Sequence, residues 1–204
     1  NKKKKPALIL KTSQVGSSYL DRDAILKKIT DIKNTCKSEN LPNVYLLHGE
    51  FTNQEMNQIY NHPKVKAMVC LTKGEGFGRP LLEFSVTGKP MIVSGWSGHM
   101  DFLNPQFVTM LHGELKQIHQ SAVVKEVLVP ESSWFNADLA EFSRRMKEVK
   151  ANYKKELKRS VRQAYYSKTN FSFDKMTEKL KSYYDEYVKE TPKLVLPTLP
   201  KLQK

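Results

Sequence analysis

Two glutamates, Glu75 and Glu83, are the residues whose spacing best predicts chemistry in this sequence. Seven residues separate them; the first lies in the glycine-rich stretch 73–80 and the second in the helix expected after it. Gly76 and Gly78 have no Cβ, so the main chain of this loop can approach a ligand closely. Its amides and the positive end of the following helix favour a phosphate. Because a carboxylate repels phosphate, Glu75 is better suited to binding sugar hydroxyls, and Glu83 to binding a ribose diol.

A strand and a helix are expected to position this loop. The apolar run 65–71 predicts the strand, Pro80 is placed for the first turn of the helix, and Gly88 is a natural end for it. Two further apolar runs, at 7–10 and 44–47, are of the kind that forms buried strands. Shorter strands are predicted at 90–94 and 107–111, and helices at 21–36 and, after the capping pair Thr52 and Glu55, up to 61.

Strands that alternate with helices over such short connections predict an α/β fold with a doubly wound, Rossmann-like parallel sheet. After about residue 136 the sequence changes to charged, amphipathic helices. The first is predicted from the apolar face Leu139, Phe142, Met146, Val149 and Tyr153, and the second from Met176, Leu180, Tyr183, Tyr184, Tyr187 and Val188. A turn with two aromatic anchors, Phe171 and Phe173, is expected between them at 169–174. We predict a basic tail at 1–6, a Rossmann-like domain at 7–165, an amphipathic helix at 166–190 and an extended, proline-containing tail at 191–204.

Composition narrows the class of protein. Hydrophobic residues make up 39% of the chain, and no apolar run approaches the roughly 20 residues needed to span a bilayer. Cys36 and Cys70 form no spaced framework, so we expect neither a disulfide scaffold nor a zinc site, and a reducing cytoplasm fits best. The start at Asn1, without a methionine, suggests a fragment of a longer protein.

The formal charge is strongly positive. It is +13, from 34 Lys and Arg against 21 Asp and Glu, which favours polyanionic partners such as a phosphate-rich acceptor or an anionic membrane surface. The lysines are spread along the chain rather than gathered in an aromatic-interleaved stripe. We therefore predict no dedicated nucleic-acid motif and favour the interpretation as solvated helix faces.

The stretch from Gly74 to Glu83, together with 87–93, resembles the retaining glycosyltransferases of the GT-B fold, notably family four. Their signature is a glutamate pair with this spacing. The likeness continues through Trp96-Ser97-Gly98, 101–103 and the helical C-terminal part, and so covers most of the chain. It implies that the chain is the C-terminal, nucleotide-sugar-binding half of such an enzyme, and that an N-terminal Rossmann-like domain is missing from it. The final helix of such enzymes crosses to the other domain, so its tyrosines are expected to be exposed here.

The resemblance also implies a role for each matching residue. Glu75 would be catalytic through its contact with the donor sugar, and Lys11 would neutralise the departing diphosphate, with Arg22 as the candidate second cation. The donor-binding residues would be Gly76, Phe77, Gly78, Arg79 and Glu83 around the diphosphate and ribose, and Gly49, Glu50 and Phe51 around the nucleobase. The sequence departs from the family at 84–86, which follow Glu83 as Phe-Ser-Val instead of Ala-Met-Ala, and in having no second cation at the usual short distance from Lys11.

The function expected from these features is transfer of a sugar from a nucleotide-diphosphate sugar to an acceptor, with retention and without a metal or other cofactor. The chain alone is expected to bind donor weakly and turn over poorly. Two alternatives stay open: a nucleotide-sugar-binding module without transfer activity, and a basic nucleic-acid-binding protein. Simpler interpretations also stay open for single residues, with Lys11 as a surface lysine and with His48, His99 and His112 as satisfied or solvent-facing histidines.

Overall fold

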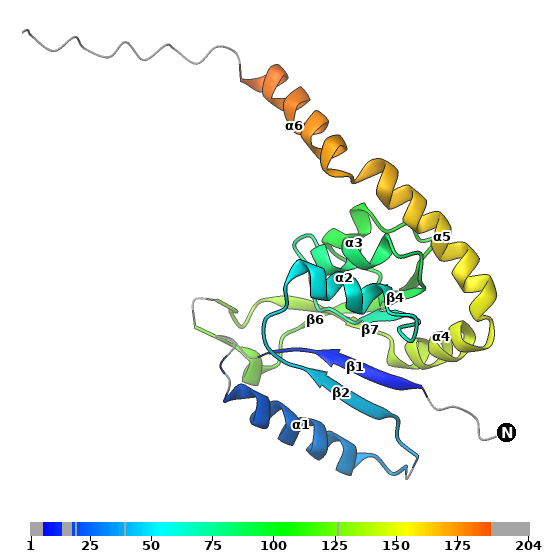
Figure 1. Ribbon diagram of the computed structural model, residues 1–204. Coiled ribbons are helices and arrows are strands. Elements are labelled where there is room, and N and C mark those ends of the chain that lie inside the picture. Colours follow the sequence, from blue (N-terminus) through cyan, green and yellow to red (C-terminus); the bar gives the residue numbers. More distant parts are fainter. Residues whose placement is uncertain (1–5, 14–17, 19, 39, 126, 189–204) are drawn as a thin grey trace, which may run out of the picture. The chain divides into compact units, whose positions relative to one another are not determined.

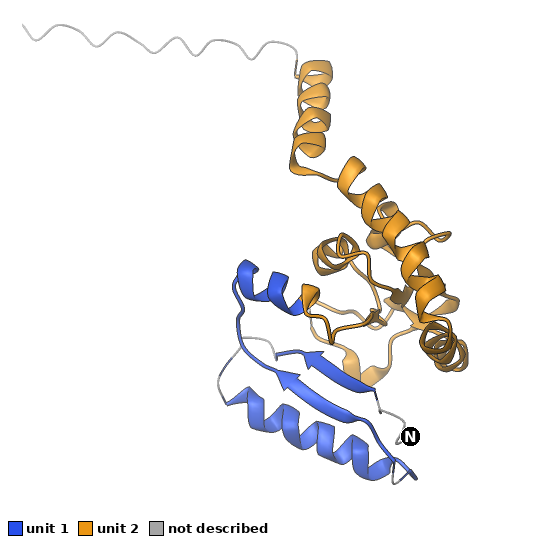
Figure 2. Cartoon of the chain, turned by 45° about the vertical axis from the view of Figure 1, so that its right-hand side comes forward, with its two compact units in different colours: residues 1–59 blue, residues 60–204 orange. Residues whose placement is uncertain are grey.

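A computed structural model describes residues 6–13, 18, 20–38, 40–125 and 127–188, and the statements below apply to these residues. The predicted tails at 1–6, apart from Pro6, and at 191–204 lie outside them. The chain divides into two compact units, residues 1–59 and 60–204 (Figure 2), and each is described by itself.

The first unit is a β-α-β arrangement of two parallel strands joined by a helix. Strand β1 (Ala7–Lys11) pairs in parallel with β2 (Asn43–Leu47), and α1 (Asp21–Thr35) connects them (Figure 1). These positions confirm the predicted strands and helix. Their predicted burial was wrong, because Leu8 and Ile9 are 46% and 45% exposed. Two strands and one helix supply too little apolar surface to cover both faces of a sheet.

Helix α2 (Asn53–Asn61) begins with the predicted capping box. The Thr52 N–H donates to Glu55 Oε2 at 2.8 Å, and the Glu55 N–H donates to Thr52 Oγ1 at 3.2 Å. Two amide donors that no helical carbonyl can reach are satisfied in this way. The start of α2 was therefore predictable from two side chains three residues apart.

The second unit contains a parallel sheet of three strands in the order β3 (Met68–Cys70), β4 (Met91–Ser94) and β5 (Thr109–Leu111). All four residues of the central strand β4 are buried. Helix α3 (Arg79–Ser85) connects β3 to β4, and the 3₁₀ turn η1 (Gly98–Asp101) lies between β4 and β5. The main core is formed by Leu81, Phe84, Met91, Val93, Phe102, Leu103 and Val108. The protein thus has the predicted α/β fold with parallel sheets, although the sheets are small.

An antiparallel strand pair in the second unit was not predicted. Strand β6 (Gly113–Gln117) pairs with β7 (Ser133–Ala137), and the connection between them contains the 3₁₀ turn η2 (Gln120–Ala122). A long connection of this kind has no two-residue hairpin signal in the sequence, and the strands are too short for a clear alternating pattern.

Three helices follow: α4 (Leu139–Ala151), α5 (Tyr153–Asn170) and α6 (Phe173–Tyr187). The single helix predicted from Leu139 through Tyr153 is wrong, because α4 ends at Ala151 and Tyr153 begins α5. Leu139 and Met146, predicted on its apolar face, are exposed. The burial pattern starts anew with α5, whose buried residues contact a different part of the unit.

The predicted turn between the last two helices is confirmed, but only one of its two predicted aromatic anchors packs against other rings. The ring of Phe171 lies 6.0 Å from that of Phe102 and 5.9 Å from that of Tyr166, whereas Phe173 is exposed. The tyrosines of α6 are exposed as expected, and so are Met176 and Leu180. Among the described residues, no helix combines the length and the apolar character needed to cross a bilayer.

Buried polar side chains fix α5 against the sheet domain. The Gln163 amide donates to the Phe102 carbonyl at 2.8 Å and to Ser167 Oγ at 2.9 Å. Ser167 Oγ in turn lies 2.8 Å from Ser85 Oγ of α3. These buried hydrogen bonds are satisfied only in one orientation of the helix. They therefore fix which face of α5 points inward and which face is exposed to solvent.

Candidate functional site

The glycine-rich loop joins β3 to α3 at the carboxyl end of the parallel sheet, where open α/β sheets bind their ligands. Gly78 precedes α3 with φ +85°, a left-handed conformation that favours glycine. A Cβ at Gly78 would also lie 3.2 Å from the Cβ of His99. The turn forms here because Gly78 has no side chain: it can adopt the left-handed conformation, and its backbone can pack closely against His99.

The main chain of Glu75 is held by the turn after β4. The Glu75 N–H donates to Ser97 Oγ at 2.8 Å, the Ser97 hydroxyl donates to the Glu75 carbonyl at 2.7 Å, and the Gly98 N–H donates to the same carbonyl at 3.0 Å. A Cβ at Gly98 would overlap the carbonyl oxygen of Gly76, so only glycine allows this approach. Ser97 has φ +91°, and no other described residue except glycine has a positive φ. Such strain is found where the surrounding structure requires it, often at a binding site.

The loop leaves three consecutive amides without a partner. Among the described residues, none accepts a hydrogen bond from the N–H of Gly76, Phe77 or Gly78. The ring of Phe77 packs 5.0 Å from that of Phe102 and keeps this segment in place. Successive free N–H groups of this kind favour an anion.

The two glutamates of the predicted site precede and follow these amides in the sequence. Glu75 is half-buried in the loop, and the Glu83 side chain is 39% exposed. Arg79 Nε lies 3.1 Å from Glu83 Oε1, and because both groups are exposed this ion pair is weak enough for a ligand to displace. The pKa of Tyr60 is raised by burial and by the charge of Glu83, and the pKa of Cys70 by burial and, more weakly, by the charge of Glu75.

Strand β7 contacts the start of the glycine-rich loop, and this contact was not predicted from the sequence. The Phe135 N–H donates to the Lys73 carbonyl at 3.0 Å, and the Phe135 ring stacks 6.1 Å from that of Trp96. The Lys73 ammonium binds Asn136 Oδ1 and lies 4.9 Å from the centre of the Trp134 ring. No pattern in 133–137 indicates this contact, because the five residues of β7 show no clear alternation.

A buried histidine also lies behind the loop. His99 has no exposed surface; its Nε2 lies 2.7 Å from the Ser94 carbonyl, so Nε2 carries the proton in the neutral ring. Its Nδ1 is buried and has no hydrogen-bond partner among the described residues. The interpretation of His99 as satisfied therefore holds for one ring nitrogen only. His112, by contrast, is exposed and binds Glu141.

The remaining predicted site residues lie in the first unit. Lys11 ends β1 and its ammonium is 5.5 Å from the centre of the Phe51 ring, so the structure brings these two residues together. Gly49 adopts φ +101° and Glu50 is exposed in the same loop. Arg22 lies in the first turn of α1, where its guanidinium is 3.7 Å from the carboxylate of the adjacent Asp23.

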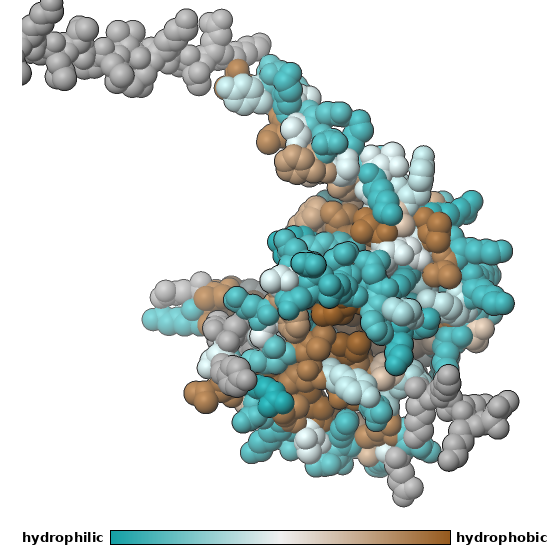
Figure 3. All heavy atoms as spheres, in the orientation of Figure 1, coloured by the Kyte–Doolittle hydropathy of each residue, from teal (hydrophilic) through white to brown (hydrophobic). Residues whose placement is uncertain are grey.

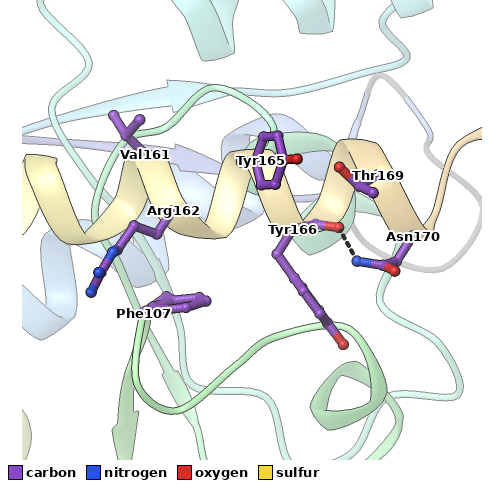
Figure 4. A pocket seen from close by; sticks show the side chains of 7 residues that line it. All are labelled: Phe107, Val161, Arg162, Tyr165, Tyr166, Thr169 and Asn170. Atoms are coloured by element: carbon purple, nitrogen blue, oxygen red, sulfur yellow. Dashed lines mark hydrogen bonds between the residues drawn. The ribbon is translucent and has the colours of Figure 1, made fainter.

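Two hollows are found elsewhere in the second unit. The larger, of about 580 Å³, lies along α5 (Figure 4) and is lined by Phe107, Val161, Arg162, Tyr165, Tyr166, Thr169 and Asn170. The smaller, of about 300 Å³, follows β4 and β5 and is lined by Gly95, Met100, Pro105, Met110, Leu111, His112, Gly113 and Phe135. Neither includes Glu75 or Glu83. In the part of the chain that is described, no three His, Cys, Asp or Glu side chains gather as a metal site would require.

No protein-family model matches this chain, and no curated protein is significantly similar to it. The resemblance of this stretch to glycosyltransferases therefore depends on the sequence motif alone.

Proposed function

We infer that this chain is the donor-binding domain of a glycosyltransferase, a doubly wound Rossmann-like domain that holds a nucleotide-diphosphate sugar for transfer with retention. The observation that supports this most strongly is the fixed main chain of Glu75. Ser97 and Gly98 hold it with three hydrogen bonds, next to the free amides of 76–78. A rigid loop that combines a carboxylate with unpaired amides suits a ligand that carries both hydroxyl groups and phosphate.

Each group has a role in this proposal. The amides of 76–78 bind the diphosphate and stabilise the charge that develops on it as the sugar leaves. Glu75 accepts hydrogen bonds from the sugar. Glu83 accepts them from the ribose, and Arg79, released from its pair with Glu83, then faces the phosphates. The role of Lys11 as a further cation for the diphosphate follows from the family resemblance alone.

The test is a calorimetric titration of the chain with UDP-, GDP-, ADP- and TDP-sugars, repeated with Glu83→Ala. We expect one nucleotide to bind selectively and the variant to lose about tenfold or more in affinity, the value of one or two hydrogen bonds to a charged group. Glu148→Ala is the matched control, because Glu148 is 42% exposed and also forms an i,i+4 pair, with Arg144 at 3.2 Å. If no donor binds while circular dichroism shows an intact fold, or if Glu83→Ala binds as well as the parent, the proposal is wrong.

A second candidate is a module that binds the donor and does not transfer it. The sequence favours it, because no second cation for the leaving group follows Lys11 at the usual short distance. Donor binding without turnover, in a protein that also carries the acceptor-binding domain, would support this alternative.

A further inference from the structure

The outward face of α5 carries an exposed apolar stripe. Its inward face is defined by the buried residues Ser160, Gln163, Ala164 and Ser167. Leu157, Val161 and Tyr165 follow one another at intervals of four, so they lie in a row along the helix. They are 36%, 56% and 75% exposed. Val161 and Tyr165 keep more than half of their surface exposed, although burial of such side chains is favourable.

The same face carries positive charge without compensation. Its exposed cations are Lys154, Lys155, Lys158, Arg162 and Lys168. Among the described residues, none of them forms an ion pair. Glu156, the one acidic residue of α5, is partly buried and pairs with Arg159 at 3.0 Å. The outward face of α5 therefore presents cations around an apolar stripe and no carboxylate. In Figure 3, apolar side chains in brown stand between hydrophilic ones in teal over this helix.

The larger hollow opens on this face. Val161, Arg162 and Tyr165 line it on α5, and Phe107 closes the other side, with the guanidinium of Arg162 5.7 Å from the centre of its ring (Figure 4). The hollow of about 580 Å³ thus combines an apolar wall with a guanidinium that no carboxylate neutralises. That chemistry suits a phosphate attached to an apolar group.

We propose that the outward face of α5 docks on a membrane surface that contains anionic phospholipid, with a headgroup phosphate at Arg162. A row of aliphatic and tyrosine side chains flanked by lysines is what a helix lying in the membrane interface requires, because the apolar row enters the headgroup region while the lysine stems reach back to the phosphates. A nucleic acid would use the cations and leave Leu157 and Val161 against a charged, hydrated backbone. The charge therefore indicates an anionic partner, and the apolar row indicates a lipid one.

The test is sedimentation of the chain with phosphatidylcholine vesicles that contain about 30 mol% phosphatidylglycerol, compared with vesicles of phosphatidylcholine alone. We expect binding to the first and not to the second. The triple variant K154Q/K158Q/K168Q should bind about 100-fold more weakly, which corresponds to about 1 kcal/mol for each lysine near an anionic surface. The variant K27Q/K28Q/K64Q is the matched control: it removes the same charge from exposed lysines elsewhere, and its binding should not change.

A second pair of measurements separates lipid from other polyanions. V161Q/Y165Q keeps every charge and should weaken vesicle binding severalfold, whereas binding of a DNA oligonucleotide, if present, should not respond to it. Equal loss in both lysine variants would mean that net charge alone acts, and would overturn the proposal. The proposal would also be overturned if the chain does not bind vesicles. It would be overturned as well if the chain binds DNA through Lys154, Lys158 and Lys168 and does not bind vesicles. None of these readouts depends on donor binding, so the inferred function stands or fails separately.

Discussion

At the scale of single residues, two glycines of the candidate site differ sharply in the space that they leave for a side chain. A Cβ at Gly98 would overlap the Gly76 carbonyl, whereas a Cβ at Gly76 would meet no heavy atom within 4 Å, and Gly76 has no positive φ. We predict that Gly98→Ala lowers the free energy of unfolding by about 1–3 kcal/mol, as overpacking does, and that Gly76→Ala leaves it nearly unchanged. Urea unfolding followed by tryptophan fluorescence measures both, because the two tryptophans, Trp96 and Trp134, lie in the second unit. Similar stability of the two variants would contradict the close packing of this turn.

At the scale of elements, Glu141 joins α4 to the end of β5. Its carboxylate accepts from the His112 N–H at 2.9 Å and from Arg145 Nε at 3.2 Å, and the His112 backbone hydrogen bond is the main cause that lowers the pKa of Glu141 below its ordinary value of 4.5. A carboxyl group with a lowered pKa in the folded state contributes stability above its unfolded pKa, and this contribution is lost as the pH falls through the folded value. We predict that stability decreases below about pH 4.5 and that Glu141→Gln reduces this pH dependence and costs about 1–3 kcal/mol at pH 7. Denaturant titrations at several pH values check it, with Glu148→Gln as control; an unchanged pH profile in Glu141→Gln would refute the assignment.

At the scale of the whole molecule, the two compact units differ in how much core each one has. Among the described hydrophobic residues of the first unit only Ile25 is buried, while the second unit holds the clusters around Phe84 and Ile92. Because stability follows buried apolar surface, we predict that the amides of 7–11 exchange hydrogen much faster than those of 91–94. Hydrogen exchange measured by mass spectrometry resolves these segments. Equal protection of both would show that the units unfold together.

The sequence by itself determined the features that depend on neighbouring residues. Apolar runs located β1 and β4, and apolar residues at helical spacing located α1. The pair Thr52 and Glu55 located the start of α2, and the glycine-rich stretch located the loop between β3 and α3. These signals act within a few residues, so they can be recognised without knowledge of the rest of the chain.

Only the tertiary structure decided how that loop is held and which surfaces stay exposed. Ser97 lies 22 positions from Glu75, and Asn136 lies 63 positions from Lys73. Nothing in local periodicity indicates which distant side chain fills a given position, because that depends on how whole elements pack. For the same reason the apolar strand β1 and the apolar row on α5 were found exposed: whether an apolar side chain is buried depends on which other element covers it.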